Sequence, residues 1–187
     1  ASKLCPMTET PHALAATPPA TDGRRTIPRL WNDAIARRSD FPAYLVQHDD
    51  HWHAVTWEEA DERVRQLANG LLALGVRKGD AFCILAQTTL EWALFDFALG
   101  CVGAISVPIY ANSSAKDAGY ILAHAEAVGV LCEDSEQLAK VEQMQGELPG
   151  LRHVLTYDDL PGLKARGIDF AAGNPGALAE AEAAIDE

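Results

Sequence analysis

Apolar residues between positions 57 and 74 recur at alternating steps of three and four, which places them on one face of an α-helix. Thr56 and Glu59 form a T-x-x-E pattern, a capping box in which each side chain satisfies a backbone N–H of the first turn. Gly75 supplies a left-handed C-terminal cap. The pattern predicts an amphipathic helix between these caps, with an inward face made of Trp57, Ala60, Val64, Leu67, Leu71 and Leu74.

Four runs rich in apolar residues follow, and each is separated from the next by a helical pattern. The first, AFCIL at 81–85, has no polar alternation, which is typical of a parallel strand covered on both faces. The helices between the runs supply the crossovers that parallel strands require. The alternation predicts an α/β fold with a doubly wound, mostly parallel sheet. A second buried strand is expected at 104–109, with its end marked by Pro108, and two more strands are expected at 128–132 and 152–157. A second T-x-x-E box, at Thr88 and Glu91, opens an expected helix that stops near Gly103. Two further helices are expected at 114–126 and 135–146.

The segments outside this alternation predict a small hairpin and two unusual ends. A helical pattern at 29–38 precedes two short strand-like runs within 43–57, which are joined by a turn rich in Asp, as in a β-hairpin. Residues 1–26 mix Pro, Ala and Thr without periodicity and are expected to be a disordered leader. The tail at 174–187 is an alanine-rich acidic segment of good helix propensity with little apolar face. We expect 27–187 to be one α/β unit cut from something longer.

Net charge excludes some classes of partner, and cysteine content indicates the cellular compartment. Lys and Arg total 15 against 27 Asp and Glu, and the resulting net charge of -12 repels nucleic acid and anionic membrane surfaces. The apolar runs are interrupted by polar residues and glycines, so we expect no transmembrane segment. Four cysteines lie far apart, and three of them sit in apolar segments where a free thiol behaves as a small buried hydrophobe. This usage predicts a reducing, cytoplasmic location.

A cluster of histidines and aspartates occupies the expected hairpin turn, at His48, Asp49, Asp50, His51 and His53. Two histidines at i and i+2 on a strand point to one side and could ligate a metal. The competing interpretation, which we favour, is a solvated hairpin tip, because turns take Asp for backbone reasons. We therefore expect no metal ligands.

Phosphate-binding and nucleophilic motifs are missing from the sequence. The junctions after the first two expected parallel strands, 86–89 and 110–114, contain no glycine, and no G-x-G-x-x-G or G-x-S-x-G pattern occurs. No histidine or basic residue flanks Cys83 or Cys101 to lower the pKa of a thiol. We predict no catalytic residue within these 187 positions.

An ordered set of short motifs resembles one enzyme family. The chain has T-W-x-E-A from Thr56 to Ala60, L-x-x-x-G-V-x-x-G-D from Leu71 to Asp80, an adjacent Glu91 and Trp92, and GAISVPIY at 103–110. Together these resemble the N-terminal region of the adenylate-forming, AMP-binding acyl-CoA synthetases, and VPIYANSSA is similar to the long-chain fatty acid CoA ligases. The resemblance implies a truncated part of the large N-terminal domain of such an enzyme.

The resemblance also implies what the parent enzyme does. Members of the family join a fatty acid or other carboxylic acid to coenzyme A through an acyl-adenylate, using ATP and Mg and releasing AMP and pyrophosphate. Their phosphate loop, adenine and ribose contacts and mobile lysine would all follow Glu187, so no cofactor is expected on this piece alone. The resemblance places Ile109, Tyr110 and Ala111 near coenzyme A; the alternative is that they form a plain strand-to-helix connection.

Two functions remain open at this point. The first is a piece of an acyl-CoA ligase that is inactive alone. The second is a self-contained protein-interaction or dimerisation domain on the same scaffold. A cut parallel sheet exposes edges that pair with other chains, so we expect a homodimer of the fragment.

Overall fold

The computed structural model describes residues 25–37 and 40–185, apart from the side chain of His48. Residues 1–24 of the predicted leader lie outside this part of the chain. Thr26, inside the predicted leader, is the N-cap of helix α1 (Ile27–Ala36), and its hydroxyl accepts a hydrogen bond from the backbone N–H of Arg29 at 3.5 Å. The first helix therefore begins two residues earlier than the apolar pattern predicts.

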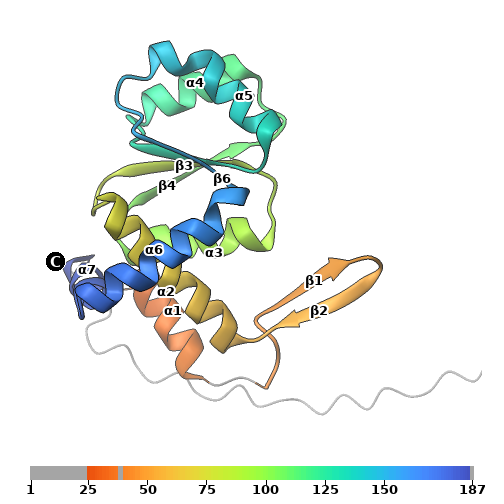
Figure 1. Ribbon diagram of the computed structural model, residues 1–187. Helices are drawn as coiled ribbons and strands as arrows, with labels where there is room; N and C mark the ends of the chain where they lie inside the picture. The colour runs from red at the N-terminus through yellow and green to blue at the C-terminus, as the bar shows by residue number, and fades with distance from the viewer. Residues whose placement is uncertain (1–24, 38–39, 186–187) are drawn as a thin grey trace, which may run out of the picture.

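A four-stranded parallel sheet forms the centre of the molecule (Figure 1). Its strand order is β4-β3-β5-β6, and all three pairings are parallel. The chain runs from β3 outward to β4, crosses back past β3 to β5, and continues to β6. This reversal confirms the predicted doubly wound topology. The strands are β3 (Ala81–Ala86), β4 (Ile105–Tyr110), β5 (Gly129–Cys132) and β6 (His153–Thr156).

Helices cover both faces of the sheet, as Figure 1 shows. Alternate residues of β3 point to opposite faces, so Phe82 and Ile84 join one buried cluster while Cys83 and Leu85 join the other. The first cluster is packed by α1, α2 (Trp57–Leu74), α3 (Leu90–Cys101), α6 (Leu160–Gly173) and α7 (Ala177–Ile185); the second is packed by α4 (Ala115–His124) and α5 (Ser135–Met144).

Helix α2 begins and ends where its local sequence predicts. The hydroxyl of Thr56 accepts from the N–H of Glu59 at 3.1 Å, and the carboxylate of Glu59 accepts from the N–H of Thr56 at 2.9 Å. Gly75 closes the helix with a φ of 89°. These contacts span only a few residues, so the local sequence is sufficient to predict them.

The start of α3 corrects the second capping box. Thr89 is the N-cap, and its hydroxyl accepts from the N–H of Trp92 at 3.2 Å, whereas Thr88 is exposed in the preceding loop. Thr89 also shares a hydrogen bond of 3.1 Å with the hydroxyl of Tyr157. The T-x-x-E pattern favours Thr88, whereas the structure uses Thr89, which also has a partner in a distant segment.

Strand β4 corrects the prediction of a second buried strand. It lies at the edge of the sheet, and the side chains of Ile105 and Tyr110 are 54% and 83% exposed. Pro108 lies within the strand and does not end it. Proline has no backbone N–H to donate to a neighbouring strand, so an edge position suits it.

Helix α6, in a segment where no element is expected from the sequence, crosses α2 at very short range. A Cβ atom on Gly70 of α2 would lie 2.5 Å from the carbonyl oxygen of Leu163, and one on Gly167 of α6 would overlap the carbonyl oxygen of Gln66. Each glycine therefore lets the facing backbone approach.

The predicted hairpin is present and extends from the body of the molecule (Figure 1). It pairs β1 (Tyr44–His48) with β2 (His51–Val55), and Asp49 and Asp50 in the turn have φ values of 48° and 61°. Two successive residues at positive φ are the mark of the tight turns that match strand twist.

The alanine-rich tail forms α7, which packs on the main body. Leu178 is buried in the first cluster, and the side chain of Asn32 donates to the carboxylate of Glu182 at 3.4 Å. Two short 3₁₀ helices complete the fold, at Gln145–Glu147 and Tyr157–Asp159. Within 25–37 and 40–185, none of the helices combines the length and hydropathy needed to cross a bilayer.

Candidate functional site at the carboxyl ends of the strands

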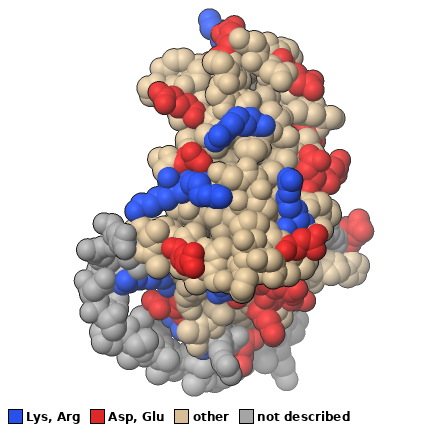
Figure 2. All heavy atoms as spheres, turned by 60° about the vertical axis from the view of Figure 1, so that its left-hand side comes forward, with Lys and Arg blue, Asp and Glu red and all other residues tan. Residues whose placement is uncertain are grey.

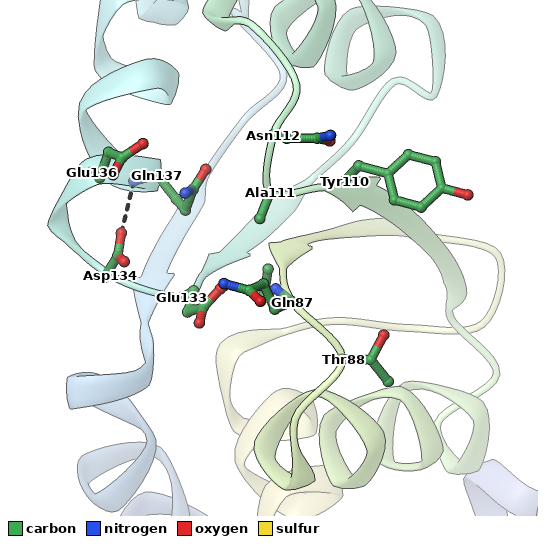
Figure 3. A pocket seen from close by; sticks show the side chains of 10 residues that line it. Gln87, Thr88, Tyr110, Ala111, Asn112, Glu133, Asp134, Glu136 and Gln137 are labelled. Carbon is green, nitrogen blue, oxygen red and sulfur yellow. Dashed lines mark hydrogen bonds between the residues drawn. The ribbon is translucent and has the colours of Figure 1, made fainter.

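A cavity of about 650 Å³ opens where β3, β4 and β5 end (Figure 3). The connections that leave β3 and β5, two neighbouring strands, run to opposite faces of the sheet, so a crevice forms between them. This is the position where doubly wound folds bind ligands. The lining residues are Ala86, Gln87, Thr88, Tyr110, Ala111, Asn112, Glu133, Asp134, Glu136 and Gln137.

Glu133 links the segments that follow β5 and β3 at the edge of the cavity. It follows β5, and its Oε2 accepts a hydrogen bond from the backbone N–H of Gln87, which follows β3, at 2.8 Å. Its own N–H donates to the carbonyl oxygen of Leu85 at 3.1 Å. The carboxylate thus continues the pairing of the two strands beyond their last ladder bond.

Lys140 holds the loop after β4, which forms another edge of the cavity. Its ammonium group donates to the carbonyl oxygen of Ala111, after β4, at 2.8 Å and to Oε1 of Gln137 at 2.9 Å. Glu136 lies 3.7 Å away, but its side chain is 77% exposed while that of Lys140 is 17% exposed. Solvent screens this ion pair, so the two hydrogen bonds are the main constraint on Lys140.

Three helices begin at this edge of the sheet, and each start is capped by the chain itself. The caps are Thr89 for α3, Ser114 for α4 and Asp134 for α5. Helix N-termini attract anions, but carboxylates of Glu133, Asp134 and Glu136 already line the cavity. The arrangement favours an uncharged or cationic ligand group over a phosphate.

The three residues that the resemblance assigns to coenzyme A occupy different environments. Ile109 is only 2% exposed and packs in the second buried cluster, beneath the rim. Tyr110 and Ala111 line the cavity. Their assignment to the cofactor stays a prediction, and side-chain contact is open only to the last two.

Sequence reasoning missed Glu133, Gln137 and Lys140. They come from a different βα connection than Tyr110 and Ala111, and only the strand order brings the two connections together. A signal for these residues was their position after an expected parallel strand, because the carboxyl ends of parallel strands share one edge of a sheet.

The other residues weighed for chemistry lie elsewhere. His51 and His53 are exposed on the hairpin, and His51 Nδ1 lies 2.7 Å from the carbonyl oxygen of Asp49. No group of three potential metal ligands occurs within the described ranges, and the side chain of His48 falls outside them. Burial raises the pKa of the Cys83, Cys101 and Cys132 thiols to about 12, so they stay protonated and unreactive at neutral pH. Cys5 lies outside the described residues.

Charged side chains do not gather on the face drawn in Figure 2. Basic and acidic groups alternate there, with uncharged surface between them. The local field on this face is therefore mixed, although the chain as a whole carries a net charge of -12.

Comparison with known proteins decides the family. The model of the AMP-binding enzyme family matches residues 31–186. The chain belongs to the AMP-binding enzyme family. This match spans the sheet, both helical layers and every residue of the cavity.

Curated relatives carry the names of fatty acid ligases. A long-chain-fatty-acid–CoA ligase of Mycobacterium bovis is 40% identical over 119 residues, which cover 62% of this chain and 20% of that protein. A ligase of the same name from Xenopus laevis is 29% identical over 146 residues, covering 78% of this chain and 19% of that protein. The chain thus spans about a fifth of the length of the curated relatives it matches.

Solved structures share the fold. The N-terminal domain of FACL13 from Mycobacterium tuberculosis superposes with a TM-score of 0.68 at 18% identity, covering 76% of this chain and 36% of that chain. An anthranilate CoA ligase in complex with anthranoyl-AMP gives a TM-score of 0.65 at 22% identity, covering 78% of this chain and 27% of that chain. Both likenesses concern the arrangement of the backbone. The fold is that of N-terminal domains of adenylate-forming enzymes.

Proposed function

We propose that this chain is the first part of the large domain of an ATP-dependent long-chain acyl-CoA ligase. The complete enzyme would convert a fatty acid, ATP and coenzyme A into acyl-CoA, AMP and pyrophosphate through an acyl-adenylate, with Mg bound to ATP. The observation that carries the proposal is the family match over residues 31–186, joined to ligase relatives at up to 40% identity.

Within that enzyme, we assign the cavity to the coenzyme A side of the reaction. Tyr110 and Ala111 line it, Tyr110 is 83% exposed, and Ile109 supports the same loop from below. An exposed aromatic ring beside a polar cavity offers a flat contact surface that the fold itself does not use. Ile109 then acts through the backbone that it anchors.

The isolated chain is expected to be inactive. Charge that develops on a transferred phosphoryl group needs fixed donors or cations around it, and the carboxylates of this cavity have the opposite sign. ATP–pyrophosphate exchange with palmitate should match a heat-treated control for the chain, while a version extended through the following coding sequence should exchange. Exchange by the chain alone would contradict the inactive assignment, and an inactive extended protein would contradict the ligase assignment.

The alternative, a self-contained interaction or dimerisation domain, has one structural observation in its favour. Edge strand β4 presents Ile105 and Tyr110 to solvent, and an unpaired edge can accept another strand. Strand β6 is the other edge of the sheet, whereas α6 and α7 are less suitable for such a contact, because they pack on α2 and α3 of the same chain.

The homodimer stays a prediction, as does the cytoplasmic location. Light scattering over a concentration series should give a dimer whose population grows with added salt, since salt screens the net charge of -12. A monomer at every concentration and salt level would contradict the predicted dimer. The sequence after Glu187 separates the two functions: a Ser/Thr/Gly-rich loop with a Lys supports the ligase, and a stop codon supports the interaction domain.

A further inference from the structure

Gln137 is a mostly buried polar side chain that has one end bonded within the protein. It is only 5% exposed, yet it lines the cavity from α5 (Figure 3). Its Oε1 accepts from Lys140 at 2.9 Å, while its Nε2 donates to no group in the part of the chain that the structure describes. Among the described residues, the fully buried side-chain atom without a partner is Ser106 Oγ, so the Nε2 of Gln137 is reached by solvent from the cavity that it lines.

Lys140 determines which end of the amide faces the cavity. An ammonium group can only donate, so the atom that meets it must be the carbonyl oxygen of Gln137, and the NH₂ group is left on the other side. Lys140 cannot easily turn away, because Ala111 accepts a second hydrogen bond from it at 2.8 Å and its side chain is 17% exposed. Lys140 therefore keeps the NH₂ group of Gln137 directed toward the cavity.

The charge of the cavity limits what this donor can bind. Glu133, Asp134 and Glu136 line the same opening, and carboxylates at this range repel a phosphate. A neutral carbonyl carries a partial negative charge on oxygen and pays no such penalty. The acceptor that fits is therefore an uncharged carbonyl, such as that of an amide.

We infer that Gln137, oriented by Lys140, donates a hydrogen bond to an amide carbonyl of the ligand in this cavity. The inference rests on the proposed function, in which the ligand is the amide-bearing pantetheine arm of coenzyme A. The phosphates of the cofactor stay outside the acidic opening. Gln137 is then a specificity-determining residue, and Lys140 is a positioning residue that acts through it and through Ala111.

The test uses the chain extended through the following coding sequence, labelled with ¹⁵N and titrated with pantetheine, which lacks the phosphates of coenzyme A. Gln137→Glu keeps the shape of the side chain but replaces the donor with a carboxylate oxygen. We expect it to weaken pantetheine binding roughly tenfold or more, since it removes a hydrogen bond and leaves two acceptors opposed. Gln143→Glu makes the same charge change at an exposed position of α5 and should leave the affinity unchanged.

The role of Lys140 has its own readout. Lys140→Met should weaken binding and shift the side-chain amide resonance of Gln137 in the free protein, while Lys140→Arg, which keeps a donor, should restore both. A purely structural role would lower the melting temperature without this rescue. Coenzyme A should bind no more tightly than pantetheine at low salt and should gain relative to it as salt is added.

The possible failures are distinct. If wild type and Gln137→Glu bind pantetheine equally, Gln137 is not a ligand donor, and the coenzyme A assignment of the cavity survives. If wild type binds neither pantetheine nor coenzyme A, the assignment of the cavity and the role of Gln137 are both overturned. Tighter binding of coenzyme A at low salt would contradict the exclusion of phosphate.

Discussion

The crossing of α2 and α6 is closely packed, whereas the cavity at the strand ends stays open. At the crossing, Gly70 and Gly167 let two backbones meet so closely that one added methyl group would overlap a carbonyl. At the cavity, about 650 Å³ stays open although three connections converge there, because Glu133 and Lys140 brace the rims through directional bonds. Close packing makes the first region intolerant of change, whereas water can replace each exposed bond of the second.

The largest effect should follow from Gly167→Ala in the close crossing. The new Cβ would overlap the carbonyl oxygen of Gln66, so α6 must move away from α2, at a cost of about 3 kcal/mol in the free energy of unfolding. Chemical denaturation measures this cost. The matched control is Gly162→Ala in the same helix, where a Cβ meets nothing within 4 Å and helix propensity should raise stability by up to ~1 kcal/mol. Equal behaviour of the two variants would show that the crossing is looser than described.

A moderate effect should follow from Thr89→Ala beside the cavity. Loss of the N-cap of α3 typically lowers stability by about 1 kcal/mol, and the hydroxyl of Tyr157 also loses its partner. Thr88→Ala should leave the melting temperature unchanged, because Thr88 is exposed and caps nothing. If Thr88→Ala were the more harmful change, the helix would begin one residue earlier, as the T-x-x-E pattern predicts.

A smaller and local effect should follow from Glu133→Ala on the rim. Gln87 is exposed, so water can take over the acceptor role, and we expect less than ~1 kcal/mol of global destabilisation. Amide hydrogen exchange at Gln87 should nevertheless become faster. Glu136→Ala is the control, since that carboxylate makes only a screened ion pair. Unchanged exchange at Gln87 would mean that Glu133 does not brace the rim.

The smallest effect concerns pH. Burial raises the pKa of the Tyr157 hydroxyl to about 12, above its ordinary value of 10.0. A folded-state pKa above the unfolded one contributes stability that is complete below pH 10 and is lost as the pH rises toward 12. The melting temperature of wild type should fall more steeply over this window than that of Tyr157→Phe, and the difference cancels the parallel titration of the buried thiols. Identical slopes would show that Tyr157 is more solvated than its burial indicates.

Local sequence was sufficient wherever the interactions themselves are local. The boundaries of α2 were predictable because Thr56, Glu59 and Gly75 act within a few residues of the groups that they cap. The hairpin was predictable for the same reason, since its turn lies between its two strands. Tyr110 and Ala111 lie in a motif of one continuous segment; the structure shows that they line the cavity, and their contact with coenzyme A stays a prediction.

Prediction failed where a residue's role depends on a distant neighbour. Pro108 and Ile105 do not reveal whether their strand is central or at an edge, because strand order is set by which crossovers pack on which face. Gly167 weakens the helical pattern of α6 in the sequence and is understandable only beside α2. Gln137 looks like an ordinary surface residue of a polar helix, and only the structure shows that it is buried and lines the cavity.

By itself, the sequence determined the capped helix, the alternation of strands and helices, and the family, since each depends on order and short spacing along the chain. Only the tertiary structure decided that β4 is an edge strand, that Thr89 caps α3, and that residues from separate connections share one cavity. The physical reason is that side-chain burial and hydrogen-bond partners across the sheet are set by packing between segments tens of residues apart, as Thr89 and Tyr157 illustrate with a separation of 68 positions. Such contacts leave no periodic trace in either segment alone.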